Sequence, residues 1–567
     1  MKFLVSQMSY FLRDPKAKRN LGALGSYLLI LAVLVTVYSI GFHVLMLLEG
    51  QKHSWLTGLY WTLTVMSTLG FGDITFTSDA GRLFSTLVLV SGLILLIIML
   101  PFAFIRFFYA PWLEAQIKAA VPKSVPGQTK DHLIICRRDW ITNGLIRKLK
   151  VMGIPYCLLE DDAEQAVQLQ EDGFNVINAP IDDPDTYRAL NVENARLLLA
   201  NAEDMVNTNI ILTVRSIDQN LPIIALAEEE DSVDIFKLSG ATYPLPLKVR
   251  LGEQLATRVS AGIGTAHEIG RFRDLVIVEF LVHDTPLAGV TLRDANLRER
   301  TGVNVVGVWK SGKLCPVQPD AVLEETFVPV AVGSASQINR LNRLLGTGEK
   351  KKHQVLVIGG GKVGQSTARA LKRRGVHVRI LDLNPKLEET LGEFCDEVII
   401  GNGSDLATMK RAGIDSVSAV ALTTHDDAQN IHLTVYCRRL RPEIGIVSRI
   451  TRERNIEAIY RAGADFVISY ASLGCEFITA YLSNREPVMV GEGADFFSLH
   501  VPEKLAGKTL LESGIGAATN LVVLAIEDGD QYNSNPGPDA VLHPQCKLFM
   551  LGTNEQRDQF VKLFCKS

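Results

Sequence analysis

The sequence lacks the cysteine patterns of metal-bound or disulfide-linked proteins. Its eight cysteines are scattered, no two of them form a Cys-x-x-Cys pair, and none precedes Cys136. Buried thiols in a reducing compartment are therefore expected rather than zinc or disulfides. A basic excess is also missing, because the formal net charge of the 567 residues is −4. Bulk electrostatics thus gives no sign of nucleic-acid binding, and we expect no nucleic-acid partner.

Charged residues are absent from two long stretches. Asp, Glu, Lys and Arg are missing from residues 20–48 and again from residues 83–105. Each stretch can cross a hydrocarbon core, which needs about 20 apolar residues. Basic residues flank the pair on the outside, and only Lys52 and Arg82 lie between the stretches. The positive-inside bias places both chain termini in the cytoplasm of a multi-pass cell-membrane protein. Two buried core helices are the alternative.

The segment between the two stretches ends in Thr68-Leu69-Gly70-Phe71-Gly72-Asp73. This hexapeptide resembles the selectivity filter of potassium channels, usually written TVGYGD. Backbone at membrane depth is tolerated only where it lines a water-filled path, and glycine allows dihedrals that are closed to other residues. Four such strands around an axis present rings of carbonyls that replace the water shell of a potassium ion. The resemblance therefore implies K⁺ at the carbonyls of Thr68, Leu69, Gly70 and Phe71.

Departures from the usual filter pattern bear on its rigidity. Leu69 stands in place of valine, and Phe71 lacks the phenol that often tethers a filter to its pore helix. Thr64 occupies the place where a further ionisable residue often lies. We expect potassium selectivity to survive these changes, with the rigidity of the filter in question.

Gly92 and Pro101 are expected to weaken the second stretch as a helix. Proline removes one backbone hydrogen bond and clashes with the preceding turn, which predicts a kink or break near Ile97. Gly92 matches the hinge glycine of the inner helix in potassium channels. We expect the gate and its hinge at Gly92, Ile97 and Pro101; a membrane proline without gating meaning is the alternative.

The aqueous part of the chain contains an internal repeat. Residues 132–136 align with residues 354–358, an offset of 222, and the register persists over about 90 residues. Short aliphatic runs alternate with helix-like stretches in each copy, which predicts an α/β fold with a parallel sheet and helices on both faces. In the second copy the predicted strands are 355–358, 376–381, 398–400, 419–422 and 445–447.

The second copy carries a dinucleotide fingerprint, Gly359-Gly360-Gly361-Lys362-Val363-Gly364, after a predicted strand and at the start of a predicted helix. Gly359 allows the tight turn, Gly361 lets the backbone approach a pyrophosphate, and Gly364 allows close helix packing. Asp382 ends the second strand, where its carboxylate can accept hydrogen bonds from ribose hydroxyls. This pattern favours NAD or an adenosine nucleotide over a ligand with a 2′-phosphate.

The first copy has lost the glycine loop. Arg137, Asp139 and Thr142 occupy the three glycine positions, although Glu160 keeps the acidic position. A structural first copy is favoured, and a ligand bound by another arrangement is the alternative.

A two-span pore followed by these two copies resembles the prokaryotic potassium channels gated by RCK (TrkA-N/KTN) domains, of the ligand-gated type with two RCK domains. The resemblance covers nearly the whole chain. It implies a tetrameric two-span α-helical pore and two tandem Rossmann-like domains, each with a crossover helix and a small α+β C-terminal lobe that starts near Thr291 or Thr509. The boundaries are an N-terminal segment at 1–20, the pore domain at 21–110, a linker at 111–130, the RCK1 N-lobe at 131–245, its crossover helix and C-lobe at 246–348, the RCK2 N-lobe at 349–470, and its crossover helix and C-lobe at 471–567.

The resemblance also implies nucleotide contacts beyond the three glycines and Asp382. Asn402 and Gly403 follow the third strand, and Arg449 follows the fifth and can reach phosphate, with a surface salt bridge as its alternative role. The remaining expected contacts are Lys362, Val363, Thr423 and Thr424.

Calcium is a further candidate ligand. Some relatives bind it through carboxylates after the fourth and fifth strands of the first domain, and only Glu228 is retained here. The acidic run at residues 228–231 suits a hard cation, but a solvated acidic face is the favoured interpretation.

Together these features predict a potassium-selective channel and not an enzyme. Four chains would form a homotetramer in the lipid bilayer, with a cytoplasmic ring of RCK domains that binds NAD or ADP and gates the pore through differential affinity for two states. A membrane-anchored NAD-dependent oxidoreductase would leave the filter segment unexplained, and its best catalytic candidate is His425 with Asp426. A nucleotide-sensing subunit of a potassium transporter would leave the complete pore unexplained.

Overall fold

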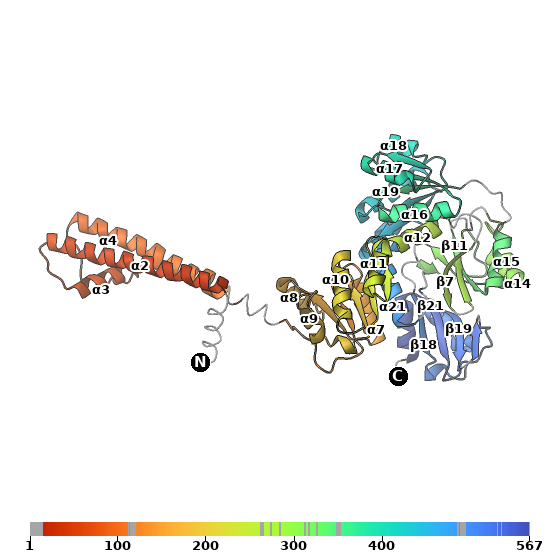
Figure 1. Cartoon of the computed structure of the whole chain (residues 1–567), viewed down its shortest axis with the longest axis horizontal. Helices are drawn as coiled ribbons and strands as arrows, with labels where there is room; N and C mark the ends of the chain where they lie inside the picture. Colours follow the sequence, from red (N-terminus) through yellow and green to blue (C-terminus); the bar gives the residue numbers. More distant parts are fainter. Residues whose placement is uncertain are drawn as a thin grey trace. The chain divides into compact units, whose positions relative to one another are not determined.

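The chain divides into two compact units (Figure 1). One comprises Met1–Lys123 and Asp161–Asn178, and the other Ser124–Glu160 and Ala179–Ser567. Residues 1–14 of the predicted N-terminal segment and most of residues 111–120 of the predicted linker lie outside the described residues. The computed structural model describes residues 15–110, 113, 121–260, 266–272, 275–282, 285–310, 313–315, 318–324, 327–346, 353–484, 487, 495–529, 531–534 and 536–565.

Two long helices of the first unit contain the uncharged stretches. Gly22–Leu48 and Asp79–Phe107 are long and apolar enough to cross a membrane. Only 17% and 11% of their most apolar windows are buried inside the chain, so these segments are unlike the core helices of a soluble protein. The elements are α2 (Pro15–Leu48), α3 (Trp55–Met66), α4 (Asp79–Gly92), the π-helical η1 (Leu93–Met99), α5 (Leu100–Phe104) and the π-helical η2 (Ile105–Tyr109).

The short helix α3 packs between the two spans around a buried aromatic cluster. Phe42, Trp61 and Phe76 are among its members. Gly92 permits the closest approach, because a Cβ atom there would lie 2.4 Å from the Cα atom of Met66 at the end of α3. This glycine is therefore required for packing, whether or not it also acts as a hinge.

The second span continues through Pro101 without a break. Met99 and Leu100 before the proline and Ile105 after it keep right-handed helical dihedrals, and the N–H of Leu100 donates to the carbonyl of Leu95, five residues back. A π-helical turn widens the backbone, so the span can accommodate the proline ring. The irregularity predicted near Ile97 is present, but as a π-helical segment rather than a kink or break.

Both sequence copies form parallel six-stranded sheets with matching topology. The orders are β3-β2-β1-β4-β5-β6 and β14-β13-β12-β15-β16-β17, and in each the strand order switches between the first and fourth strands, which lie side by side. The first copy has β1 (Leu133–Ile135), β2 (Tyr156–Glu160), β3 (Val176–Asn178), β4 (Leu197–Ala200), β5 (Ile223–Leu226) and β6 (Tyr243–Leu245). The second has β12 (Gln354–Ile358), β13 (His377–Asp382), β14 (Glu397–Ile400), β15 (Ala419–Leu422), β16 (Gly445–Ile450) and β17 (Phe466–Ser469).

Helices connect the strands of both copies. In the first copy they are α7 (Thr142–Met152), α8 (Ala163–Glu171), α9 (Pro184–Ala189), η3 (Val192–Asn194), α10 (Asp204–Arg215) and α11 (Ser232–Ser239). In the second they are α16 (Lys362–Arg373), η5 (Pro385–Leu387), α17 (Glu388–Gly392), α18 (Leu406–Arg411), α19 (Asp427–Leu440), η6 (Glu453–Asn455) and α20 (Ile456–Arg461). The α/β prediction is therefore confirmed.

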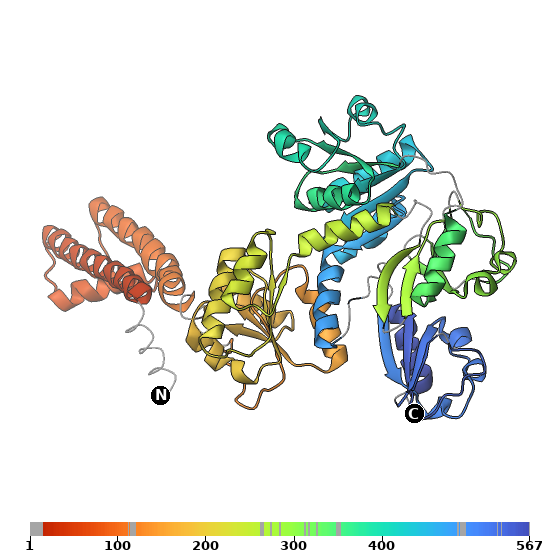
Figure 2. The ribbon, with the colours of Figure 1, turned by 45° about the vertical axis from the view of Figure 1, so that its right-hand side comes forward.

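The two copies exchange their crossover helices. Helix α12 (Leu247–Val259) leaves the first copy and packs on α16 of the second, and α21 (Tyr470–Leu482) packs on α7 of the first. In both ribbon views α12 lies along α16 (Figures 1 and 2). Gly252 makes the first contact close, because a Cβ atom there would lie 2.5 Å from the Cβ of Ser366. Gly474, 222 residues after Gly252, makes the second contact close in the same way. A Cβ atom there would lie 2.5 Å from Ile141 Cδ1.

Each copy is followed by a small α+β lobe with an antiparallel sheet. The strand orders are β10-β9-β11-β8-β7 and β18-β21-β19-β20. The lobes contain β7 (His267–Phe272), β8 (Leu275–Glu279), α13 (Leu292–Ala295), α14 (Leu297–Thr301), β9 (Asn304–Lys310), β10 (Lys313–Cys315), β11 (Val328–Gly333) and α15 (Ala335–Leu345), and then β18 (Asp495–His500), η7 (Glu503–Leu505), α22 (Leu510–Ser513), α23 (Ile515–Thr519), β19 (Val522–Asp528), β20 (Gln531–Ser534), β21 (Lys547–Gly552), α24 (Asn554–Phe560) and η8 (Val561–Cys565).

The predicted starts of these lobes were wrong. Thr291 and Thr509 lie after the first strands, and each side chain caps a short helix by accepting a backbone N–H. The Thr-Leu motif marks a helix N-cap inside the lobe, so it is a local signal and not a domain boundary.

Candidate functional site

The segment after α3 has a backbone that alternates in handedness. The φ angles of Thr68, Gly70 and Gly72 are +61°, +47° and +74°, while the N–H groups of Leu69 and Gly70 donate to the carbonyl of Thr64 at 3.0 and 3.2 Å. Left-handed backbone is costly for side chains other than glycine, so glycine suits positions 70 and 72. An alternating backbone turns successive carbonyls toward one side, as a carbonyl-lined pore requires.

Tyr60 supplies a tether that the sequence analysis missed. Its hydroxyl donates to Asp73 Oδ2 at 3.1 Å, and its ring stacks on Phe71 with a centroid distance of 6.4 Å and an interplanar angle of 2°. The pore helix therefore holds the filter segment through Asp73, although Phe71 has no phenol. A tyrosine thirteen residues before the aspartate was the available sequence signal.

Glu49 joins the end of the first span to the start of the second. Its carboxylate accepts the backbone N–H and the hydroxyl of both Thr77 and Ser78, at 2.5 to 3.0 Å. These hydrogen bonds, led by that from the Ser78 hydroxyl, lower the pKa of Glu49 to about 2. The loop that carries the filter segment is thus fixed at both ends.

The predicted gate residues lie along the irregular part of the second span. Gly92 ends α4, Ile97 lies in η1, and Pro101 lies in α5. The side chains of Ile97 and Met99 are 42% and 47% exposed within the single chain, so neighbouring copies can cover them. Their role in gating stays a prediction.

The glycine loop of the second copy leaves a helix N-terminus open. Gly359 has a φ of +108°, and a Cβ atom on Gly364 would lie 1.8 Å from the carbonyl oxygen of Gly359. Gly361 is the N-cap residue of α16, which receives no side-chain cap, and a Cβ there would meet nothing within 4 Å. The first N–H groups of α16 and the positive end of its dipole can therefore meet an anion.

Asp382 lies against this loop from the neighbouring strand. It is the last residue of β13, and its Oδ2 accepts the N–H of Gly360 at 2.6 Å, while Oδ1 accepts the N–H of Asn384 at 2.8 Å. Each carboxylate oxygen has a second lone pair, which can accept a ribose hydroxyl.

The other predicted contacts gather at the same edge of the sheet, where β12 and β15 diverge. Thr423 follows β15, and its hydroxyl donates to the carbonyls of Ile358 and Gly359 at 3.0 and 2.7 Å. Asn402 follows β14 and accepts the N–H of Ser404 at 3.0 Å. Lys362 and Val363 open α16, Gly403 follows Asn402, and Thr424 follows Thr423.

Arg449 lies inside β16 and not after it, because the strand runs three residues beyond its predicted end. Its Nη2 donates to the Thr451 hydroxyl at 2.8 Å, and its Nε is a buried donor without a hydrogen-bond partner among the described residues. Burial lowers the pKa of Arg449. The hydrogen bond of its guanidinium goes to Thr451 and not to the glycine loop, so its role at phosphate stays a prediction.

The first copy fills the corresponding loop with its own side chains. Asp139 Oδ1 accepts the N–H of Ile141, the N–H of Thr142 and the hydroxyl of Thr142 at 2.8 to 3.0 Å. Arg137 pairs with both oxygens of Glu203 at 2.8 and 2.7 Å. This arrangement supports the structural interpretation of the first copy. A cleft of about 530 Å³ remains beside the loop, lined by Arg137, Arg138, Asp139, Trp140, Asn143, Asn201, Ala202, Glu203 and Glu228.

Glu228, the weak calcium candidate, is paired with a cation of the chain. Lys248 Nζ lies 3.4 Å from Glu228 Oε1, and the Glu228 N–H donates to Asp204. Within the part of the chain that the structure describes, no group of three or more His, Cys, Asp or Glu residues is placed to hold a metal ion. The geometry thus adds no support for the calcium prediction.

Comparison with known proteins gives matches along most of the chain. The Ion channel family model matches residues 29–109, the TrkA-N domain model matches 133–245 and 355–470, and the TrkA-C domain model matches 277–346 and 497–564. Probable potassium channel protein 2 of Methanocaldococcus jannaschii is 25% identical over 57% of this chain and 98% of its own length.

A solved structure of the GsuK channel bound to NAD is 37% identical to this chain, with a TM-score of 0.56 over 96% of this chain and 99% of that one. A second structure, of the GsuK channel, has the same identity and coverage and a TM-score of 0.57. The resemblance to potassium channels with two RCK domains, predicted from the sequence, is confirmed at this level of identity. The chain therefore belongs to the family of GsuK-like potassium channels, in which a two-span pore precedes two tandem RCK domains.

Proposed function

We propose that four copies of this chain assemble around the filter segment, with both termini in the cytoplasm and the RCK domains as a ring below the membrane. One chain supplies a single wall of a carbonyl-lined pore, and four are needed to surround a potassium ion. The first copy also exposes an apolar face on α10 and α11, where Met205 and Leu238 are 86% and 89% exposed. A patch of this kind favours contact with another subunit.

The same proposal includes NAD or ADP as the regulatory ligand of the second copy. The observation that carries it is the uncapped N-terminus of α16, with open space at Gly361 and a carboxylate, Asp382, beside the loop. A pyrophosphate fits the first feature and a ribose the second. The GsuK structure bound to NAD, 37% identical to this chain, agrees with this ligand class.

Reconstituted flux tests the proposal. Full-length protein in liposomes should pass K⁺ and not Na⁺, and flux should change when NAD or ADP is added on the cytoplasmic side. Gly70→Ala should abolish flux, because φ at this position is +47° and an L side chain opposes that conformation. Equal permeability to Na⁺ and K⁺ in the wild type would refute the assignment. The effect of calcium on flux is measured separately. Of the carboxylates that bind calcium in some relatives, only Glu228 is retained here.

The gate is proposed to lie at or below Ile97, where four apolar side chains can close a dewetted constriction. Ile97→Asp should wet this constriction and raise the open probability without ligand. Pro101→Ala should restore a helical hydrogen bond and change the balance between open and closed states. If neither variant alters open probability at any ligand concentration, the gate lies elsewhere, and the filter becomes the leading candidate.

An oxidoreductase role finds no support at the residues proposed for it. Asp426 accepts the N–H of Ala428 at 2.8 Å and caps α19, so it is engaged in a structural contact beside His425. A search for nicotinamide reduction or oxidation under turnover separates this alternative from channel activity.

A further inference from the structure

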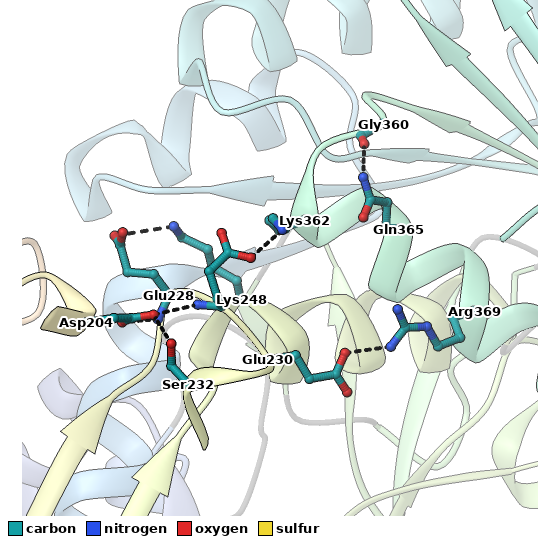
Figure 3. Close-up of polar contacts among 10 residues, drawn as sticks. Asp204, Glu228, Glu230, Ser232, Lys248, Gly360, Lys362, Gln365 and Arg369 are labelled. Atoms are coloured by element: carbon teal, nitrogen blue, oxygen red, sulfur yellow. Dashed lines mark hydrogen bonds and ion pairs between the residues drawn. The ribbon is translucent and has the colours of Figure 1, made fainter. Parts of the chain in front are cut away.

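The helix that opens the nucleotide site is held by carboxylates of the other copy. Lys362, the first residue of α16, forms an ion pair with Glu229 of the first copy. Arg369, about two turns further along α16, pairs with Glu230 at 2.6 Å. Figure 3 shows Glu230 extending from the turn after β5 toward Arg369 of α16. The two copies are therefore linked electrostatically at the loop where a nucleotide would bind.

The acidic turn is itself firmly anchored. Asp204, at the start of α10, accepts the N–H groups of Glu228 and Glu229 at 2.8 and 3.1 Å and the hydroxyl of Ser232 at 2.6 Å (Figure 3). Glu228 pairs within its own copy, with Lys248 of α12. The backbone of the turn is thus fixed, and the carboxylate of Glu229 is presented to Lys362 from a rigid support.

Lys362 stands next to Gly361, so its ammonium group is available to two negative partners. One partner is Glu229, in the structure described here. The other is an anion at the open N-terminus of α16, which has no side-chain cap. A single ammonium that turns to the phosphates gives up part of its contact with Glu229, and the carboxylate of Glu229 then faces the phosphates as a like charge.

We propose that the phosphates of the nucleotide and Glu229 compete for Lys362, so that nucleotide binding breaks an ion pair between the two copies. The inference rests on the proposed nucleotide site of the second copy. Loss of the Lys362–Glu229 pair is then the first structural consequence of binding. The pair joins α16 to a turn of the first copy that Asp204 holds in place, so its loss weakens the hold of that turn on α16.

The expected size of the effect follows from exposure. The side chains of Lys362 and Glu229 are 53% and 52% exposed, so the pair resembles ordinary surface ion pairs, which contribute up to about 1 kcal/mol, equivalent to about fivefold in affinity. Removing the charge of Glu229 should therefore tighten nucleotide binding by about fivefold at low salt, and less at high salt because of screening.

Calorimetry of NAD and ADP binding to the full-length protein in detergent tests this proposal. Glu229→Gln should tighten binding, and Lys362→Met should weaken it. In the Lys362→Met background, Glu229→Gln should tighten binding by much less, because only like-charge repulsion remains once the competing cation is gone. Equal effects of Glu229→Gln in both backgrounds would indicate simple charge repulsion and overturn the competition.

Two neighbouring acids provide matched controls. Glu228→Gln and Glu230→Gln remove the same charge from the same turn, but their partners are Lys248 and Arg369. Competition predicts that Glu229→Gln tightens nucleotide binding more than either control variant does. A bulk electrostatic effect predicts similar changes in affinity for all three variants. A wild type that binds neither NAD nor ADP contradicts the proposed nucleotide site. A wild type that binds, with unchanged affinity in Glu229→Gln, contradicts only the competition.

Discussion

The first and second copies differ throughout the loop that follows their first strand, and one of these positions decides how the next helix is capped. The first copy has Asp139 where the second, 222 residues later, has Gly361. Asp139 satisfies the first N–H groups of α7 and brings a carboxylate to the helix N-terminus. Gly361 leaves the equivalent groups of α16 without a side-chain cap. The same fold thus yields a closed, self-capped terminus in one copy and an anion-accepting terminus in the other.

The contacts across the two copies differ in a related way. Trp140 of the first copy occupies the position of Lys362, and the guanidinium of Arg452 lies over its ring at 4.8 Å. Arg147, the counterpart of Arg369, forms an ion pair with Glu453. At the first copy a cation–π contact replaces the lysine–carboxylate pair. Of these two equivalent positions, the one beside the open loop therefore has the lysine that can turn to a phosphate.

Among the variants that test this comparison, Gly364→Ala should change stability and nucleotide binding the most. A Cβ atom at Gly364 would lie 1.8 Å from the carbonyl oxygen of Gly359, so α16 must move away from β12. We expect a loss of about 2–4 kcal/mol in the free energy of unfolding, with loss of nucleotide binding. Denaturant unfolding and calorimetry measure both. Thr142→Ala, at the same position of the first copy, should leave nucleotide binding unchanged.

Gly361→Asp would convert the open loop into the closed form of the first copy. Nothing lies within 4 Å of a Cβ atom at Gly361, so the fold should tolerate the side chain. The new carboxylate would cap α16 and repel a pyrophosphate, and we expect affinity to fall by about 100-fold or more, about 3 kcal/mol. Gly361→Asn, which adds a side chain without a charge, serves as control and should lose less nucleotide affinity. Wild-type affinity in Gly361→Asp would move the site, most plausibly to the first copy.

Asp382→Ala should weaken NAD or ADP binding by about 1–3 kcal/mol, because ribose hydroxyls would lose their acceptor. The same substitution at Glu160, the equivalent acid of the first copy, should leave binding unchanged when measured by calorimetry. An effect at Glu160 similar to that at Asp382 would show that both copies bind nucleotide.

Asp139→Ala should have the smallest effect, a loss of about 1 kcal/mol in the free energy of unfolding, as expected for a missing helix cap. Asp139→Asn should retain most of the capping. Burial raises the pKa of Asp139 above its usual range, so the folded state binds the proton more tightly than the unfolded state. The stability of the wild type relative to Asp139→Asn should therefore rise as pH falls toward the pKa of the unfolded carboxyl group. Unfolding curves across acidic pH test this, and a constant difference would refute it.

Local patterns allowed much of the fold and of the site to be predicted. The fingerprint lies after β12 and at the start of α16, as predicted, and the strand predicted at 419–422 has the observed bounds of β15. These features are determined by residues close in sequence, namely aliphatic runs and glycines in tight turns. The end of β16 was placed three residues too early because its last residues include the polar Ser448 and Arg449.

Contacts between distant residues were beyond sequence analysis. The bond from Tyr60 to Asp73, the clamp of Glu49 on Thr77 and Ser78, and the exchange of α12 and α21 each depend on how elements pack in space. The π-helical turn before Pro101 likewise makes room for the proline ring. The expected clash of proline with the preceding helical turn does not by itself predict this accommodation. These contacts determine how rigid the filter segment is and which copy each crossover helix supports.

The cap formed by Asp139 limits how steeply the proposed channel can respond to nucleotide. With the helix of the first copy capped, each chain keeps one open glycine loop, and the proposed ring of eight RCK domains from four chains would have about four equivalent sites. The Hill coefficient of an all-or-none transition cannot exceed the number of sites, so the dose–response curve is bounded by four and not by eight. A duplicated domain that keeps the fold but caps its own helix N-terminus thereby limits the cooperativity of the whole assembly.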